Sequence, residues 1–579
     1  MSENTELPKN WVKCELGEAV EIHDNERKPI NNSERNSRIE NKTLNELFPY
    51  YGATGQVGWI DDFLSNEESV LVGEDAAPFL DPIKNKAYLV KGKFWVNNHA
   101  HILRGLPGYV SNRFILHQMN YVDYQEHVSG STRLKLTKTA LTKMPFILCP
   151  FSEQNRIADK IDELFSELDA GVNELKAAQV KLKHYRQSLL KSAVEGALTQ
   201  KWRDDNKHQI EETGKELLNR ILIERKQRWE QNKLEEFKEK GKNPPKNWQY
   251  KYPEPIQPDT TDLPELPEGW VWATIDQLAI NKRYGSSSKT NDDACGVPVL
   301  RMGNIQDGKL DYDNLKYLPE GHKEFPELLL NDGDLLFNRT NSAELVGKTA
   351  VYKDIGKPVS YASYLISVTF SEHFLPEIAA HYINSVLGKK WIAEVMNQTA
   401  GQANVNGTKL GALAIPLPSI SEQKVLIEEV SNEFESIDLQ IKATALGLKQ
   451  SEAQRKNILK SAFSGKLVPQ YENDEPAPLL LEKISNERED LASKVKPKKT
   501  RQPKKKAKVM DTLLEVLTAE DKWIDAQEAF EKCGVTKNTT SDDIEKLYLE
   551  LRELLNSNQV EVKKVDKKDK LRIVRNEAS

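Results

Sequence analysis

A long stretch that occurs twice constrains the fold of this chain more than any other feature. The first copy begins at Ser152-Glu153-Gln154 and the second at Ser421-Glu422-Gln423. An internal repeat of this kind has to be interpreted first, because it determines how the whole fold is divided. A constant shift along the chain superposes the copies without a gap, and the matched pairs include Phe165 and Phe434, Asp169 and Asp438, Arg186 and Arg455, and Gly196 and Gly465.

Apolar residues recur within both copies at alternating spacings of four and three. Held over about four heptads, this alternation keeps one stripe of a helix against a partner helix and indicates a coiled coil. The alternative is two ordinary buried helices in separate cores, but at 1.5 Å per residue each helix would be about 65 Å long, which exceeds the width of a small domain. Polar residues interrupt the seam, which favours a fixed register over maximum stability. The predicted seam residues are Ile161, Phe165, Leu168, Val172, Leu175, Gln179, Leu182 and Leu189 in the first copy, and Val430, Phe434, Ile437, Ile441, Leu448 and Ile458 in the second.

Both copies also have the flanking residues of a helix. Prolines precede each copy, and Ser152 and Ser421 are the predicted N-caps. Gly196 and Gly465 follow the helical patterns, where glycine commonly ends a helix. Each copy is therefore predicted to form one long helix.

The composition is that of a globular protein with a charged surface, since 29% of the residues are charged and 38% are hydrophobic. A chain of 579 residues should form about three or four domains. The net charge of −6 gives no overall basic signature, so nucleic-acid binding would depend on local patches. With no apolar run of signal-peptide or membrane-spanning type, we expect a cytoplasmic protein without membrane contact. The cysteines lack metal-ligand spacing and are expected to be reduced: Cys14, Cys149, Cys295 and Cys533.

The repeat extends beyond the two helices. The opening segment Leu7-Pro8-Lys9-Asn10-Trp11 is echoed by Leu266-Pro267-Glu268-Gly269-Trp270. Each precedes a module of short predicted strands with some helix, which makes both modules α+β and gives the molecule a pseudo-twofold arrangement. The predicted organisation is a first module (1–150), a first long helix (151–198), a charged helix with a proline-rich linker (199–265), a second module (266–418), a second long helix (419–467), a docking helix with a basic linker (468–508) and an accessory domain (509–579).

The C-terminal part of the sequence differs from the repeat. Residues 495–508 are nearly all Lys, Arg and Pro, which is typical of a solvated tether and would also add affinity for phosphates. The remainder shows three helical patterns (509–517, 524–530 and 544–555) followed by two strand patterns (560–565 and 571–574). This order predicts a small α/β domain, winged-helix-like, for which protein docking and DNA contact are both open.

Catalytic and metal-binding motifs are missing from the sequence. No GxxxxGK[ST] loop, glycine-rich dinucleotide fingerprint or His/Cys cluster with zinc spacing occurs. Asn243-Pro244-Pro245 is superficially similar to the Asn-Pro-Pro-aromatic loop of adenine methyltransferases, but Lys246 follows it within a lysine-rich segment. The chain is therefore predicted to be non-catalytic, with no metal site and no bound cofactor.

Two modules on a duplicated frame suit the recognition of two half-sites on a DNA duplex. Both modules contain basic and amide side chains, and such residues can pair with base edges, Arg with guanine and Asn or Gln with adenine. The candidate DNA-binding residues are Lys93, Asn97, Asn98, His99, Arg104 and Arg133 in the first module, and Arg301, Asn304, Arg339, Asn341, Lys348, Gln402 and Asn404 in the second.

Over residues 7–490 the sequence resembles the DNA-specificity subunit of type I restriction–modification systems. The resemblance lies in the paired Leu-Pro-x-x-Trp openings, the paired Ser-Glu-Gln helix starts and the Leu-Lys-Ser-Ala-x-x-Gly-x-Leu helix ends. Within the modules, segments 50–55, 71–75, 300–305 and 336–342 look like parts of target-recognition domains. The first of these segments adds Tyr51 to the candidate DNA-binding residues.

The resemblance implies a fold and a set of partners. It implies two target-recognition domains joined by a long antiparallel coiled coil, each reading half of a bipartite, asymmetric sequence in double-stranded DNA. It further implies two methyltransferase subunits, which bind S-adenosylmethionine and methylate adenine N6, and restriction subunits, which use ATP and Mg. These cofactors would be on the partners.

Two other functions are compatible with the sequence. The chain could be a self-contained DNA methyltransferase or nuclease, which the missing motifs argue against. It could also be a coiled-coil scaffold that carries protein-binding modules and has no DNA role. Footprinting with a methyltransferase partner would distinguish the scaffold, because a scaffold would protect no two-part site.

Overall fold

The structure is a computed structural model that describes residues 7–399, 401–494, 512–520, 522–535, 541–565 and 568–574. The chain divides into two compact units, Met1–Ile484 and Ser485–Ser579. The predicted basic linker at 495–508 lies outside the described residues.

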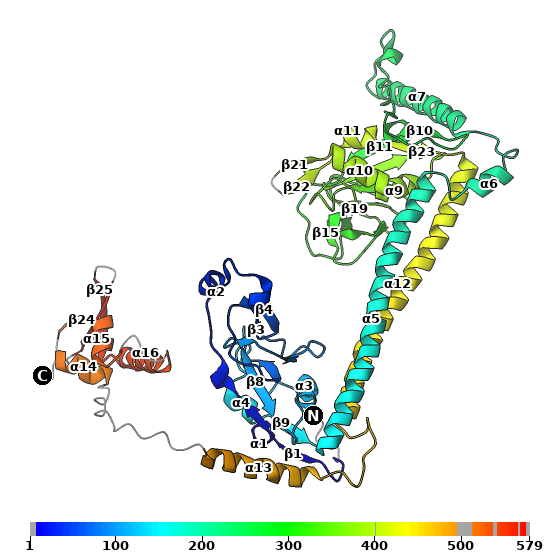
Figure 1. The fold of residues 1–579 in the computed structure, drawn as a ribbon. Helices are drawn as coiled ribbons and strands as arrows, with labels where there is room; N and C mark the ends of the chain where they lie inside the picture. Colours follow the sequence, from blue (N-terminus) through cyan, green and yellow to red (C-terminus); the bar gives the residue numbers. More distant parts are fainter. Residues whose placement is uncertain are drawn as a thin grey trace. The chain divides into compact units, whose positions relative to one another are not determined.

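Two long helices form the frame of the first unit (Figure 1). Helix α5 (Phe151–Val194) has 44 residues and helix α12 (Ile420–Ala462) has 43. They pack side by side and run antiparallel, so that Arg186 near the end of α5 bonds Asp438 in the first half of α12. The predicted N-caps are wrong by about half a turn. Pro150 and Ser419 hold these positions, and Ser419 Oγ accepts a hydrogen bond from the backbone N–H of Glu422 at 3.3 Å.

The predicted seam faces the helix–helix interface. Ile161, Leu189, Val430, Ile437 and Ile458 are buried, and the other predicted seam residues are half-buried. The residues between them are mostly exposed. This alternation arises because side chains at the two spacings of the pattern lie on one stripe of each helix.

Module 1 contains three small sheets that lie beside the start of α5. The inner sheet has the strand order β2–β8–β5–β6, and all its neighbours are antiparallel. Short apolar runs form these strands, and β5 is buried along its full length. Helix α3 (Asn112–Tyr121) packs against α5 and α12 and joins this sheet to the frame. The strands are β1 (Val12–Glu15), β2 (Val20–Ile22), β3 (Phe48–Gly52), β4 (Gly55–Ile60), β5 (Ser69–Gly73), β6 (Ala87–Val90), β7 (Trp95–Val96), β8 (Ala100–Gly105) and β9 (Pro145–Leu148).

Module 2 repeats this plan with a larger set of strands. Its inner sheet has the order β11–β20–β16–β18, and helix α9 (Pro376–Asn384) joins it to α5 and α12. Two three-stranded sheets of this module have the orders β17–β22–β21 and β15–β12–β19. The strands are β10 (Val271–Thr274), β11 (Ala279–Tyr284), β12 (Val297–Leu300), β13 (Ile305–Gln306), β14 (Lys309–Leu310), β15 (Lys316–Leu318), β16 (Leu335–Asn338), β17 (Thr340–Asn341), β18 (Thr349–Val351), β19 (Ser360–Tyr361), β20 (Leu365–Phe370), β21 (Asn397–Thr399), β22 (Gln402–Asn404) and β23 (Ala414–Leu417).

Each module also carries a docking helix. On module 2, α7 (Gly214–Glu239) buries Leu217 and Ile221, and on module 1, α13 (Ala477–Lys494) buries Leu480 and Ile484. The backbone N–H of the first residue of each helix donates to the opening segment of its module, Gly214 to Gly269 and Ala477 to Asn10. The region 240–265, predicted as an extended linker, instead folds back, with Trp248 stacked on Trp229 of α7 at 5.6 Å.

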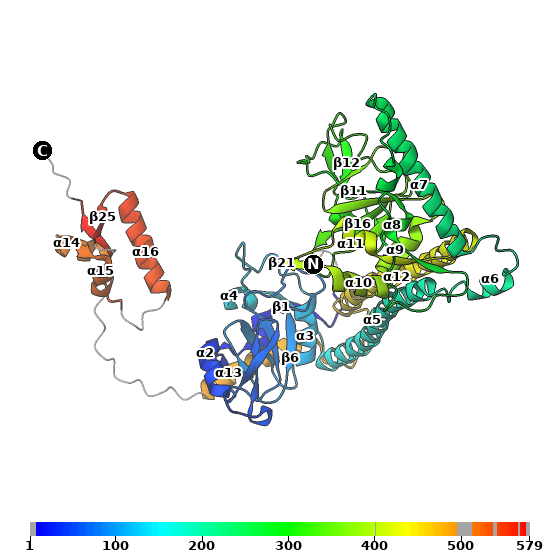
Figure 2. The same cartoon turned by 90° about the horizontal axis from the view of Figure 1, so that it is seen from above.

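The second unit is a small α/β domain with its own core (Figure 2). Its elements in chain order are α14 (Leu513–Glu520), β24 (Ile524–Asp525), α15 (Ala526–Lys532), α16 (Ser541–Asn556), β25 (Val560–Val565) and β26 (Lys568–Ile573). The three strands are antiparallel in the order β24–β26–β25.

Candidate nucleic-acid interface

The repeated sequence motifs meet where each module joins the frame. Trp11 Nε1 donates to Glu153 at 3.0 Å, and Trp270 Nε1 donates to Glu422 at 2.8 Å. The opening tryptophan of each half is therefore tied to the glutamate of its own Ser-Glu-Gln start. The neighbouring glutamine bonds the module, since the side chain of Gln154 accepts from the Ser111 N–H and that of Gln423 from the Leu375 N–H, both at 2.9 Å.

The two ends of the frame also share an arginine–aromatic contact. Arg186 lies 4.2 Å from the ring centroid of Phe434 and bonds Asp438 at 3.0 Å. At the opposite end, Arg455 lies 4.1 Å from the ring centroid of Phe165 and bonds Asp169. Since these residues are related by the sequence repeat, the same set of contacts joins the two helices at both ends of the frame.

Module 2 contains a polar cavity of about 800 Å³ between the loops after β11, β12 and β17. Four of the predicted residues line it, and sequence reasoning did not single out the other polar side chains of the lining. The predicted residues in the lining are Arg301, Asn304, Asn341 and Lys348; the others include Lys289, Gln306, Asn314 and Tyr364.

The predicted residues in this cavity differ in their accessibility. Asn304 is buried, and its amide donates to the carbonyls of Asp311 and Asp313, so it shapes the loop. Arg301 Nη2 donates to the carbonyl of Asn314 at 2.6 Å, while its Nε is buried without a hydrogen-bond partner among the described residues. Lys348 Nζ lies 3.0 Å from Gln306 Oε1 at an exposed position.

Arg339, Gln402 and Asn404 lie beside this cavity and not in its lining. Arg339 stacks on Tyr284 at 4.9 Å. Asn404 Nδ2 donates to Thr340 Oγ1 at 2.6 Å, which fixes β22 against β17, and Gln402 on the same strand is exposed. The structure thus brings these three residues together on the rim formed by the β17–β22–β21 sheet.

In module 1 the predicted residues form a smaller cluster around Asp75. His99 Nδ1 and Arg133 Nη2 both approach Asp75 Oδ1, at 2.8 and 3.0 Å. Asn97 is buried and its side chain accepts from the His99 N–H, whereas Asn98 is exposed.

Lys93 and Tyr51 lie in aromatic surroundings in the same module. Lys93 Nζ lies over the ring of Phe63 at 4.7 Å and remains exposed. The ring of Tyr51 packs against Tyr88 and Phe94, and burial raises the pKa of Tyr51 above its usual value. Tyr51 is therefore half-buried among aromatic rings, and Lys93 is an exposed cation beside Phe63.

Arg104, which the sequence predicts to contact DNA, has its side chain engaged within module 1. Arg104 is buried on β8, and its guanidinium pairs with Glu26 at 2.8 and 2.6 Å. It also donates to Ser65 and Ser69, and its hydrogen bonds lower the pKa of Glu26. Arg104 therefore holds the module together from inside.

Sequence reasoning missed a group of cations on and near α2 (Asn32–Ile39). Arg35 lies over the ring of Tyr50 at 5.0 Å, and Arg38 lies over Trp95 at 5.2 Å. The signal in the sequence is the polar segment 32–39, which carries Arg35 and Arg38 three residues apart on one side of a helix. Arg38 Nε also bonds Asp61 at 2.6 Å, so that its charge is paired within the module.

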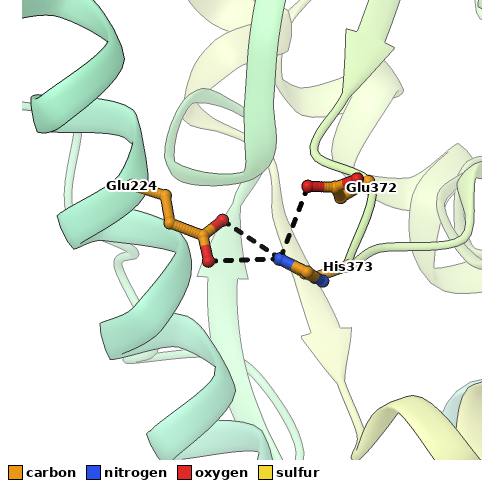
Figure 3. Close-up of side chains that lie close together, drawn as sticks. All are labelled: Glu224, Glu372 and His373. Carbon is orange, nitrogen blue, oxygen red and sulfur yellow. Dashed lines mark hydrogen bonds and ion pairs between the residues drawn. The ribbon is translucent and has the colours of Figure 1, made fainter.

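One cluster in the first unit has the composition of a metal site. His373 and Glu372 follow β20, and Glu224 comes from α7; their nitrogen and oxygen atoms lie close together (Figure 3). His373 Nε2 lies 3.1 Å from Glu224 Oε2 and 3.8 Å from Glu372 Oε1. The imidazole thus pairs with both carboxylates, which ties α7 to module 2.

In the part of the chain that the structure describes, no helix has both the length and the apolar character needed to cross a bilayer.

Comparison with known proteins identifies the frame and the modules together. The family model described as type I restriction modification DNA specificity domain matches residues 8–177 and 267–444. The chain is 25% identical over 349 residues to the type I restriction enzyme EcoKI specificity subunit of Escherichia coli strain K12, across 58% of this chain and 63% of that protein. This chain thus spans less than two thirds of that relative's length.

Two further matches cover more of the molecule. The EcoDI specificity subunit of Escherichia coli is 22% identical over 492 residues, across 83% of this chain and 96% of the relative. A solved chain from a study of complex assembly and conformational transition of the type I R-M system has a TM-score of 0.54 at 14% identity, across 80% of this chain and all of that one. This chain therefore shares its fold with that solved chain, and the family model matches both halves of the repeat. This chain belongs to the family of type I restriction–modification DNA specificity proteins.

Proposed function

We propose that this chain is the DNA-recognition subunit of a type I restriction–modification complex, in which each module reads one half of a bipartite, asymmetric site. The repetition of the Arg186–Asp438 contact by Arg455 and Asp169 at the opposite end of the helix pair carries this proposal. A symmetric frame with two different modules suits two different half-sites at a fixed distance.

The cavity of module 2 supports base recognition by this module. Arg301 and Asn341 line it, and these side-chain types pair with guanine and adenine edges in the major groove. Lys348 and Lys289 in the same lining would contact phosphates, which position a protein on the duplex. We exclude Asn304 from direct contact, because its amide is already bonded within the loop.

In module 1 the exposed cations supply the corresponding surface. Lys93 and Arg133 are exposed, and Asn98 lies between them in the chain. Arg35 extends the positive surface at the aromatic strands, whereas Arg38 is paired with Asp61. These residues replace Arg104 in the proposed contact set.

The frame would also dock the partner subunits. Val180, Leu439 and Leu446 are exposed apolar residues on the long helices, and an apolar groove of about 520 Å³ lies between the helices near Leu168 and Ile458. Exposed apolar surface of this kind marks protein interfaces. We propose that two methyltransferase subunits, which bind S-adenosylmethionine and methylate adenine N6 after base flipping, dock here.

The other parts of the proposed complex act around this subunit. Restriction subunits that use ATP and Mg would join the assembly, and this chain would itself be non-catalytic. The complex would work in the cytoplasm, where its substrate DNA lies.

A change in the length of the frame tests the proposal. Seven residues, one heptad, are inserted after Ala177 and after Leu446, which are equivalent points of the two helices. A whole heptad keeps the seam facing the partner helix. It lengthens each helix by about 10.5 Å, or about three base pairs of duplex. Methylome sequencing of a host with the partner subunits should show a longer spacer between unchanged half-sites.

The control is the same insertion in α5 alone. It makes the two helices unequal in length and shifts the residues of α5 beyond the insertion by one heptad along α12, so it should abolish methylation. An unchanged spacer in a double-insertion protein that still methylates DNA would contradict the proposed ruler function of the frame. Methylation at the same half-sites with a longer spacer would support it.

A further inference from the structure

The second unit has the element order of a winged helix. Its order is helix, strand, helix, helix, strand, strand, and the sheet order is β24–β26–β25. One face of this sheet is buried, with Ile524, Val560 and Leu571 in the same core as the three helices. In this arrangement α15 and α16 are the helix pair that resembles a helix-turn-helix, and the β25–β26 hairpin is the wing.

The helix that would enter a DNA groove is acidic. In a helix-turn-helix the second helix lies in the major groove. Here that helix is α16, and residues 541–556 contain Asp542, Asp543, Glu545, Glu550 and Glu553 against Lys546 and Arg552. Glu545 and Glu553 are exposed. Since a duplex carries one negative charge per about 1.7 Å, α16 would be repelled from the groove.

The wing has the opposite charge. Residues 560–574 contain six Lys or Arg and three Asp or Glu. Lys563 on β25 and Lys570 on β26 are directly opposite each other, so both side chains leave the same face of the hairpin. Arg572 lies two residues further along this face, where it pairs with Glu561 and stacks on the half-buried Trp523 at 4.8 Å.

The opposed lysines need an explanation, because like charges directly opposite on an antiparallel pair are destabilising. Asp525 is opposite Lys570 on its other side, but its carboxylate caps α15 by accepting from the Gln527 N–H at 3.0 Å. Anions bound to Lys563 and Lys570, one on each, would offset the repulsion. A nucleic-acid backbone presents such anions in series, as its phosphates.

We propose that the outer face of this wing, formed by Lys563, Lys570 and Arg572, binds the phosphate backbone of duplex DNA without reading its sequence. The second unit thereby gives the chain a third DNA contact, which is independent of the two modules. Its effect is a sequence-independent increase in affinity, with a salt dependence set by the number of phosphates neutralised.

The test uses the full-length chain and a short duplex of mixed sequence without any methylation site. Fluorescence anisotropy over a series of KCl concentrations gives the slope of log affinity against log salt. Each phosphate contact contributes about 0.9 to that slope, so Lys563→Ala with Lys570→Ala should reduce its magnitude by about 1.8. The matched control, Lys546→Ala with Arg552→Ala, removes the same charge from α16 and should leave the slope unchanged.

Lys563→Arg with Lys570→Arg keeps the charge and should retain the wild-type slope. The proposal is overturned if the alanine pair in the wing leaves the slope unchanged, or if the α16 pair lowers it equally. The proposal is also overturned if the arginine variant has a slope as small as that of the alanine variant. The loss would then come from a change in the structure of the hairpin and not from the lost charge. The result is separate from bipartite recognition, since the duplex contains no half-site.

Discussion

The ring of Pro8 occupies the space that a Cβ atom at Gly465 would need. Gly465 ends the second long helix with φ of +73°, whereas Pro8 belongs to the opening segment of module 1. At the other end a Cβ atom at Gly196 would lie 2.5 Å from Cγ of Pro267. The end of each long helix is therefore fitted to the opening segment of the opposite half.

Gly465→Ala should destabilise the first unit by about 1–3 kcal/mol, because it adds the strain of a left-handed conformation and displaces Pro8. Gly171→Ala is the control. It lies within α5 with open space around it, so alanine should stabilise the protein by about 0.5–1 kcal/mol. Thermal unfolding measures both changes, and effects of the same sign would contradict the predicted fit.

The two arginine–carboxylate pairs of the frame should differ in strength. Arg186 and Asp438 are 15% and 26% exposed, whereas Asp169, the partner of Arg455, is 61% exposed. Since solvent screens the exposed pair, double-mutant cycles should give a coupling of about 1 kcal/mol for Arg186–Asp438 and about 0.3 kcal/mol or less for Arg455–Asp169. Equal couplings in denaturant unfolding would refute the assigned difference.

His381 should make the stability depend on pH. Its Nε2 is buried without a hydrogen-bond partner among the described residues, and burial lowers the pKa of His381 to about 4. The unfolded chain takes up this proton near pH 6.5, so the stability is fully present above pH 6.5 and falls toward pH 4, by at most about 3 kcal/mol. His381→Phe, measured by urea unfolding at pH 7 and pH 5, should flatten this part of the profile.

His117 at the equivalent joint provides the comparison for His381. Its Nε2 bonds Asp162 at 2.9 Å, and this hydrogen bond lowers the pKa of Asp162. The stability from Asp162 is present above its unfolded pKa near 3.8 and is lost as pH falls through its lower folded value. The stability of the His117→Phe variant should therefore keep its dependence on pH between pH 5 and 7. If that dependence is lost in His117→Phe and kept in His381→Phe, its assignment to His381 is contradicted.

Lys348 should contribute to DNA affinity through a phosphate. Lys348→Ala should weaken binding to all sequences and reduce the salt slope by about 0.9. Lys353→Ala is the control, since Lys353 is exposed outside the cavity and pairs with Glu377. Titration of labelled DNA with the assembled methyltransferase complex measures both variants, and equal loss in the two would argue against a contact by Lys348.

Arg104 should be required for stability. Arg104→Met leaves Glu26 partly buried without its partner and should destabilise module 1 by about 3 kcal/mol. Lys93→Met, at an exposed position of the same module, should change stability by less than about 0.5 kcal/mol but weaken DNA binding. Chemical unfolding followed by footprinting separates these effects, and a stable Arg104→Met protein would refute the structural role.

The sequence predicted the parts of the fold that depend on local periodicity. The long helices, their glycine ends and the α+β character of the modules follow from residue spacing, and the match to the family model confirms the resemblance. The hydrogen bond between Trp11 and Glu153 could not be derived, because the two residues lie far apart in the chain. Strand β8 buries Arg104 through its pairing with β2 and β5, and no local pattern reveals such burial.

The fit of Pro8 to Gly465 and of Pro267 to Gly196 closes the two halves into a ring of contacts. The order in which the halves follow one another along the polypeptide therefore contributes little to the fold. A rearranged gene that joins residue 484 to residue 7 through a flexible linker and opens the chain within 240–247 should specify the same first unit. One module could therefore be replaced by another of the same fold within this ring without redesign of the frame.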